Sequence, residues 1–155
     1  MNELCHLKGK GEIMSHARAR QAIETKLAAW SATRPIRVVY PNQPFTPNPS
    51  ETYLRAFQLP ASTTCRYLGG DAYEYTGIYQ ISIVCPSAQA MATAEGLIDE
   101  LARLFRVDTA LTRNGFEGLI TEPLDQGPSI TESATYTVPA SFAYAGVADQ
   151  PPAGA

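Results

Sequence analysis

The chain has 155 residues, of which 45% are hydrophobic, and its formal net charge is −3. This length predicts one domain with a sizeable core, and the small negative charge argues against a basic surface for sequence-specific nucleic-acid binding. No apolar run reaches the roughly 20 residues that span a bilayer, so no membrane partner is expected. Three cysteines without CxxC spacing favour free thiols in a reducing compartment over a disulfide framework.

The N-terminal part predicts a leader followed by a helix. Residues 1–13 have no hydrophobic period and are expected to be disordered, and Met14 is a candidate natural start. Mass spectrometry of the protein made from its native gene would reject that start by finding residues 1–13. Residues 16–30 predict an amphipathic helix that is capped by Ser15 and keeps Arg18 on its outer face. Its apolar stripe consists of Ala19, Ile23, Leu27 and Trp30.

A short strand and a stiff loop are expected next. Residues 36–40 are rich in β-branched side chains and predict a strand. The prolines of residues 41–49 hold the following loop extended, and Phe45 is its one large apolar side chain. Two interpretations of Phe45 stay open: it folds back onto the domain, or it is an exposed anchor for a partner.

The sequence then predicts a hairpin. Residues 51–59 alternate as a strand, and Pro60 is expected to stop it. Residues 64–68 predict a weaker strand, and Gly69–Gly70 predicts a tight turn because glycine accepts positive φ without steric cost. Residues 73–84 predict the long strand that returns antiparallel.

A second helix and a further strand follow. Residues 88–105 have a broad apolar face with helical spacing, and Ser87 is the expected N-cap. Residues 115–121 predict a strand, and the prolines and glycine of residues 122–128 predict a loop.

The last predicted strand, residues 133–144, contains Pro139, which favours a sheet edge or a bulge. From residue 146 onward a proline- and alanine-rich tail is expected to be disordered. The elements therefore predict a single α+β domain over residues 14–145. In it, two helices pack on one face of a mainly antiparallel mixed sheet, in the order αββββαββ.

No motif marks a catalytic, metal or cofactor site, and no enzyme is expected. His6 lies in the leader and His16 at a helix start, so a Ser–His–Asp or Cys–His site would lack a histidine in the folded body. Cys5 and His6 fall short of the about four ligands of a structural zinc site. The carboxylates available for acid–base chemistry are scattered without a paired motif. They are Glu74, Asp99, Glu100, Glu117, Glu122 and Asp125.

Several segments, taken in order, resemble the tail terminator family of long-tailed bacteriophages and prophages, the minor tail proteins that cap the tail tube. They are residues 27–30 (LAAW), 38–45 (VVYPNQPF), 53–55 (YLR), 77–81 (GIYQI), 104–105 (LF) and 136–144 (YTVPASFAY). The resemblance covers about residues 14–145 and leaves out the leader and the tail.

The resemblance implies a structural protein of the virion tail that is assembled in the host bacterial cytoplasm. Such a protein forms a hexameric ring on the last ring of tail-tube subunits, stops polymerisation and presents a surface to head-completion or connector proteins. The free chain would be a monomer or that ring. We expect partner contacts on the loop and the hairpin, with Phe45→Ala weakening assembly while the fold stays intact. The expected contact residues are Asn42, Phe45, Arg66, Tyr67, Asp71 and Tyr73.

Two other functions stay open. Another head–tail connector, neck or tail-completion protein would bind a different ring, so co-purification with tail-tube or portal-side protein separates the two. A small ligand-binding domain or enzyme needs a deep pocket with convergent polar groups, of which the sequence gives no sign. Tail-tube and tape-measure genes beside this one would favour the terminator.

Overall fold

The computed structural model describes residues 16–151 and 153, and the structural statements below concern that part of the chain. Seven strands form one sheet with the order β1-β2-β3-β7-β5-β4, and β6 pairs with β7. Only β1 and β2 run parallel. The strands are β1 (Val38–Val39), β2 (Tyr53–Thr64), β3 (Ala72–Pro86), β4 (Ala110–Arg113), β5 (Phe116–Gln126), β6 (Ile130–Thr131) and β7 (Thr135–Asp149).

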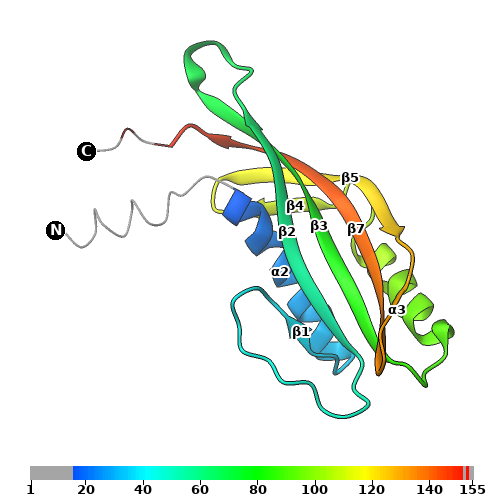
Figure 1. Cartoon of the computed structure of the whole chain (residues 1–155). Helices are drawn as coiled ribbons and strands as arrows, with labels where there is room; N and C mark the ends of the chain where they lie inside the picture. Colours follow the sequence, from blue (N-terminus) through cyan, green and yellow to red (C-terminus); the bar gives the residue numbers. More distant parts are fainter. Residues whose placement is uncertain (1–15, 152, 154–155) are drawn as a thin grey trace.

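Two helices of the described residues, α2 (His16–Thr33) and α3 (Met91–Leu104), pack on one face of this sheet (Figure 1). The predicted two-layer α+β class is therefore confirmed. The element order is αβββαββββ, close to the expected one. The expected leader at residues 1–13 and the expected cap Ser15 lie outside the described residues.

Strands β3 and β7 form the centre of the sheet. They pair in register over their whole length of 15 residues. Even-numbered residues of β7 from Tyr136 to Ala148 are buried, which confirms the predicted inner face. Phe142 of that face stacks on Phe105 at 4.8 Å between ring centroids. The opposite face of β3, β5 and β7, with the odd-numbered residues of β7, carries no helix of the described residues, and we call it the open face.

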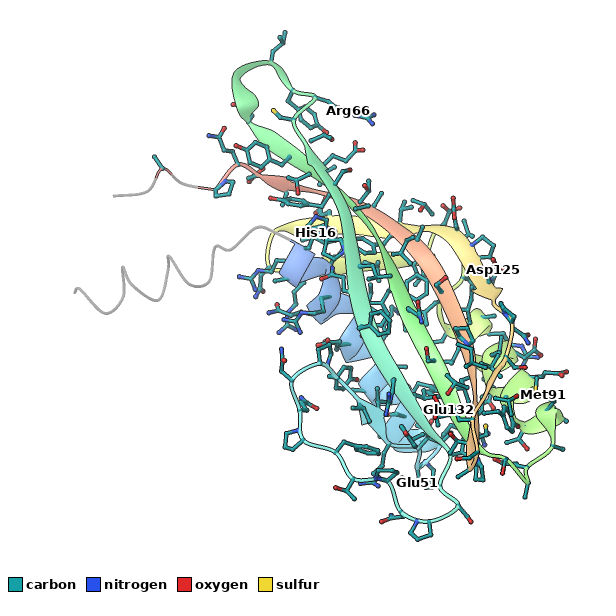
Figure 2. All side chains as sticks on the ribbon, viewed as in Figure 1. His16, Glu51, Arg66, Met91, Asp125 and Glu132 are labelled. Atoms are coloured by element: carbon teal, nitrogen blue, oxygen red, sulfur yellow. The ribbon has the colours of Figure 1, made fainter. Side chains whose placement is uncertain are left out.

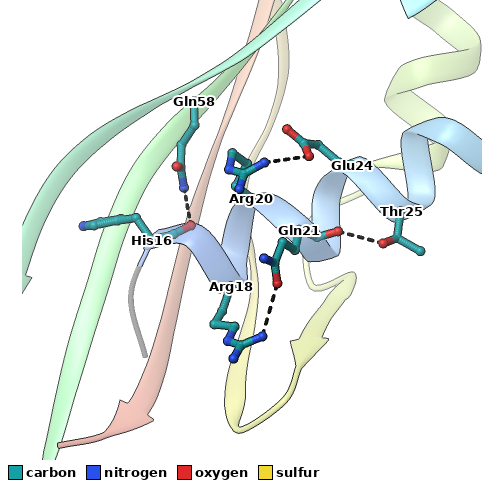
Figure 3. Close-up of polar contacts among 7 residues, drawn as sticks. All are labelled: His16, Arg18, Arg20, Gln21, Glu24, Thr25 and Gln58. Atoms are coloured by element: carbon teal, nitrogen blue, oxygen red, sulfur yellow. Dashed lines mark hydrogen bonds and ion pairs between the residues drawn. The ribbon is translucent and has the colours of Figure 1, made fainter. Parts of the chain in front are cut away.

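Helix α2 uses the predicted apolar stripe and buries two residues more, Ala22 and Arg18. Ala19, Ile23 and Leu27 are fully buried, and Trp30 packs against the core. The prediction that Arg18 points outward was wrong, because its side chain is 6% exposed. An arginine stem can cover apolar surface while the guanidinium keeps polar partners, and the Arg18 Nη1 donates to Gln21 Oε1 at 3.3 Å (Figure 3).

Helix α3 begins later than predicted, at Met91, and its N-cap is Ala90 without a side-chain hydrogen bond. The prediction of Ser87 as the cap was wrong. The Ser87 N–H instead donates to the Ala134 carbonyl at 3.0 Å, and a turn from Pro86 to Gln89 follows. Ser87 thus ties the end of β3 to the start of β7 and is too far from the helix to cap it.

Strand β2 continues through Pro60, so the prediction that this proline ends the strand was wrong. The pairing with β3 shifts register between Pro60 and Ser62, and β2 then runs on to Thr64. Since β1 covers only Leu54 and Arg55, Pro60 lies on an open sheet edge, where a missing N–H is tolerated. The weaker strand predicted at residues 64–68 is not separate. It is replaced by a tip with a short 3₁₀ turn, Leu68–Gly70.

Strand β5 likewise continues where a loop was predicted, and it reaches Gln126. Two register shifts against β7, on either side of Glu122, accommodate the irregular stretch that contains Pro123. Strand β4 completes the sheet edge and, like β6, was not predicted.

Strand β7 departs from prediction in two ways. It is an interior strand, and its pairing with β3 runs through Pro139 without a register shift, so the expected edge position and the expected bulge at Pro139 were both wrong. The Pro139 carbonyl accepts from Gly127 at 2.8 Å, and the N and C=O of one strand residue point to the same side. The side of Pro139 that lacks an N–H therefore faces the gap between β5 and β6, and no hydrogen bond to β3 is lost. The strand also extends to Asp149, so residues 146–149 of the expected disordered tail are ordered strand.

Candidate interaction surfaces

The hairpin tip between β2 and β3 projects beyond the rest of the sheet (Figure 1). Gly69 and Gly70 have φ of 83° and 71°, which confirms the predicted glycine turn. Leu68 is 98% exposed and Tyr67 is 47% exposed at this tip. Arg66 forms an exposed ion pair with Glu74 at 3.4 Å. The tip therefore presents an uncovered aliphatic and an aromatic side chain.

The rest of the tip is tied to the sheet. The Asp71 carbonyl accepts from the Gln150 N–H at 2.9 Å. Tyr73 is half-buried and packs against the core. Of the four tip residues expected at a partner contact, Arg66, Tyr67 and Asp71 are exposed, and Tyr73 supports the base.

The proline-rich loop at residues 41–49 is held against the domain by Phe45 and by the Arg37–Glu51 pair that flanks it. The Phe45 ring lies 4.8 Å from the ring of Tyr53, and the Arg37 guanidinium lies 4.4 Å from the Phe45 centroid. Arg37 Nε donates to Glu51 at 2.6 Å, and the Asn48 N–H donates to the same carboxylate at 2.8 Å. Hydrogen bonds from Arg37 first and Asn48 second lower the pKa of Glu51 to about 2.

These contacts show that Phe45 folds back onto the domain. Its ring is half-buried against Tyr53, which favours the first interpretation, and a contact of Phe45 with a partner stays a prediction. Asn42 in the same loop is exposed and has a φ of 63°.

The six expected contact residues fall on two surfaces rather than one. The tip and the proline-rich loop lie at opposite ends of β2, as the positions of Arg66 and Glu51 show (Figure 2). Twelve extended residues separate them by roughly 35 Å. The structure thus offers two separate places for neighbours and does not bring the six residues into one site.

A polar cluster, which was not predicted from the sequence, joins the start of α2 to β2 and β7. Gln58 Nε2 donates to the Tyr144 hydroxyl and to the His16 carbonyl, each at 2.7 Å (Figure 3 shows the second bond). His16 Nδ1 lies 2.8 Å from the same hydroxyl, and its Nε2 lies 3.2 Å from Thr63 Oγ1. The one signal in the sequence is Gln58, a polar residue in phase with the core side of its strand.

The cluster fastens elements together. Burial lowers the pKa of His16, and a hydrogen bond from the imidazole to the Ser62 backbone partly opposes this shift. Burial raises the pKa of Tyr144 to about 12, with the bond from Gln58 opposing it. A neutral His16 that accepts from Tyr144 and donates to Thr63 satisfies all partners. A Cβ at Gly77 would overlap the Tyr144 hydroxyl, so glycine gives this hydroxyl its room.

The six scattered carboxylates divide into two groups. Glu74, Asp99 and Glu100 form ion pairs with nearby arginines. The other three lie on β5 and face the open side of the sheet. No group of three or more potential metal ligands occurs among residues 16–151 and 153. In the same part of the chain, no helix has the length and apolar character needed to cross a membrane.

The fold and these surfaces define a class: a two-layer α+β domain with a projecting hairpin, open sheet edges and charged surface groups. A family model described as "Phage tail terminator protein" matches residues 18–144. The chain therefore belongs to the phage tail terminator family and is a structural component of a phage tail. The resemblance noted in the sequence is thereby confirmed.

A solved structure is similar to this chain over most of its length. It shares 32% sequence identity with this chain at a TM-score of 0.72, and the match covers 91% of this chain and 99% of that one. Its name states no function. No curated protein matches the sequence.

Proposed function

We propose that this chain caps the tail tube as a ring, most simply a hexamer, ends tail polymerisation and provides the surface to which the head is joined. The observation that carries this proposal is the family match over residues 18–144. The role is one of assembly in the host cytoplasm and involves no catalysis. Its partners are further copies of the chain, the tail-tube protein and a head-completion or connector protein.

The shape of the domain supports this role. A capping protein needs separate surfaces for the tube, for the head side and for its neighbours in the ring. The hairpin tip and the proline-rich loop at the two ends of β2 are suitable for such contacts (Figure 2). The tip exposes Tyr67 and Leu68, and the loop exposes Asn42 on a backbone held by the Arg37–Glu51 pair. Since Phe45 is half-buried, we propose that it positions the loop.

The experiment is tube assembly with purified tail-tube protein, followed by electron microscopy of tube lengths. We expect the wild-type chain to stop growth and to co-purify with tubes. We expect Leu68→Ser to weaken capping, because Leu68 is 98% exposed and moving its apolar surface from water into a partner is favourable. Exposed Ile130 far from the tip offers a matched control, Ile130→Ser, which should cap normally.

Other outcomes point to the alternatives. Co-purification with portal-side protein and no effect on tubes would indicate another connector or tail-completion protein. Equal capping by the wild type and Leu68→Ser would remove the tip from the contact while the capping role stands.

A further inference from the structure

A groove runs between α2, the loop after β1 and the end of β4. Its volume is about 720 Å³, and its lining includes Arg20, Asn42 and Arg113. A smaller groove of about 290 Å³ shares Thr25 and Arg113 with it and adds Lys26. We call the two grooves together the basic trough. It is open to solvent along one side of α2.

The basic trough carries positive charge that the chain does not neutralise. Arg20 is paired with Glu24 at 2.8 Å (Figure 3). Arg113 is exposed, and neither it nor Lys26 forms an ion pair within residues 16–151 and 153. The chain as a whole has a net charge of −3. A concentration of positive charge on an acidic protein marks a surface suited to an acidic partner.

A complementary surface lies on β5 of the same chain. Glu117, Glu122 and Asp125 are exposed, and their partners across the ladder are odd-numbered residues of β7. Residues directly opposite each other share a face of the sheet, so all three carboxylates project from the open face. We call them the acidic stripe. None of the three forms an ion pair within the part of the chain that the structure describes.

An apolar hollow adjoins the acidic stripe. It has a volume of about 440 Å³, and its lining includes Glu117, Leu119, Ala145 and Val147. Leu119 is 39% exposed there. A partner with cationic groups and some apolar surface would therefore be better matched than a purely ionic one.

The two charged surfaces cannot meet within one molecule. Leu111 is buried in the core, and Arg113, two residues further along β4, points to the same, helix-bearing side. Glu117 faces the opposite side of the same sheet edge. A contact between two different surfaces of identical chains is heterologous, and its repetition gives a closed ring or an open filament.

We propose that the basic trough of one copy binds the acidic stripe of the next copy, so that Arg113 and Lys26 meet Glu117, Glu122 and Asp125 across the subunit interface. The inference rests on the proposed ring and names the contact that closes it. The occupant of the trough is a second copy of the chain because the required opposite charge, unpaired and exposed, is present on the chain itself.

A charge-reversal experiment tests this contact. The wild type, Arg113→Glu and Glu122→Lys are examined by size-exclusion chromatography with light scattering at low and at high salt, up to millimolar concentration. We expect the wild type to associate at low salt and to weaken at high salt. Each variant alone should associate at least about tenfold more weakly, because like charges then face each other. An equimolar mixture of the two should associate again, since wild-type surfaces meet each other and reversed surfaces meet each other.

Matched controls carry the same charge changes elsewhere. Arg106 and Glu132 are exposed and lie outside both surfaces, so Arg106→Glu and Glu132→Lys should associate like the wild type. Circular dichroism checks that each variant is folded, and Lys26→Glu replaces Arg113→Glu if that variant is not.

Three results would overturn the proposal: a wild type that stays monomeric at low salt, charge variants that associate like the wild type, or a mixture that fails to restore association. Tube capping by the wild type is scored separately. Capping with unaffected charge variants would refute the contact and leave the proposed function standing. Restored association in the mixture without capping would refute the function and leave the contact.

Discussion

Gly146 offers a direct test of the C-terminal half of β7, the part that the sequence assigns to a disordered tail. A Cβ at this position would overlap Cζ of Phe116 and would lie 2.7 Å from its Cε2 and 2.8 Å from the Cα of Gly118. Phe116 is fully buried, and Gly118 is the ladder partner of Gly146. Neither neighbour can move aside without disturbing the core or the sheet.

The expected cost of Gly146→Ala follows from these contacts. Overpacking a well-packed core costs about 1–3 kcal/mol. Because a buried ring and a backbone atom are both in the way, we expect the upper part of that range, about 2–3 kcal/mol. For a chain of this size that corresponds to a Tm lower by about 4–12 °C. Urea unfolding followed by circular dichroism, together with thermal melts, measures both quantities.

Gly96 provides the control. It lies inside α3, and a Cβ there would meet nothing within 4 Å. Gly96→Ala should therefore stabilise the protein by about 0.5–1 kcal/mol through helix propensity. If Gly146→Ala unfolds at the same urea concentration as the wild type, the packing described for the end of β7 is wrong, because only an unpacked tail would tolerate the methyl group.

Three further predictions concern the polar contacts. His16 has a folded-state pKa below 6.5, so as the pH falls below 6.5 the unfolded state binds more protons than the folded state and the free energy of unfolding declines. The urea midpoints measured at pH 7.5 and pH 5.5 should therefore differ less in His16→Gln than in the wild type. Tyr144→Phe removes the hydroxyl that His16 contacts in the core, and equilibrium unfolding should show a loss of about 1–3 kcal/mol. Glu51→Gln weakens the partner of Arg37, so hydrogen exchange in residues 41–49 should speed up at neutral pH. In the wild type, Glu51 should lose its charge, and with it the ion pair to Arg37, only as the pH falls below 4.5 toward about 2. Slow hydrogen exchange that persists in Glu51→Gln would contradict this anchoring of the loop.

The sequence predicts the parts of the fold in which one physical signal is strong. The period of two in residues 136–144 and the helical period in residues 88–105 each identify a buried face, and both faces point into the core as predicted. Gly69 and Gly70 identify the hairpin turn because positive φ is costly for other residues. These signals are local, and the structure preserves them.

The failures arise where a tertiary neighbour overrides a local preference. Pro60 is tolerated in β2 because it lies on an open sheet edge, where its missing N–H breaks no ladder bond. Pro123 is tolerated in β5 because two register shifts interrupt the pairing with β7 around it. Pro139 is tolerated inside the sheet because its N–H side faces the gap between the end of β5 and the start of β6, where no strand pairs with β7. The sequence predicts that Gly146 begins a disordered tail, whereas in the structure its lack of a side chain makes room for the Phe116 ring. None of these partners can be identified from local sequence.

The candidate surfaces show the same division. The hairpin tip was predictable from its glycines, whereas the grouping of Glu117, Glu122 and Asp125 on one face depends on the irregular register of β5. Their spacing of five and three does not follow a strand period of two. The trough depends on β4 lying beside α2, a contact between elements far apart in the sequence. A single sequence carries no signal for either.

The central claim is that this chain ends the growth of a tail tube. The most direct measurement adds the purified chain, below one copy per tube subunit, to polymerising tail-tube protein and follows light scattering and tube length by electron microscopy. The account predicts short tubes that carry a ring of this chain at one end, with the chain eluting together with the tubes. Tube lengths that stay unchanged even with the chain in excess, and no co-elution, would contradict it.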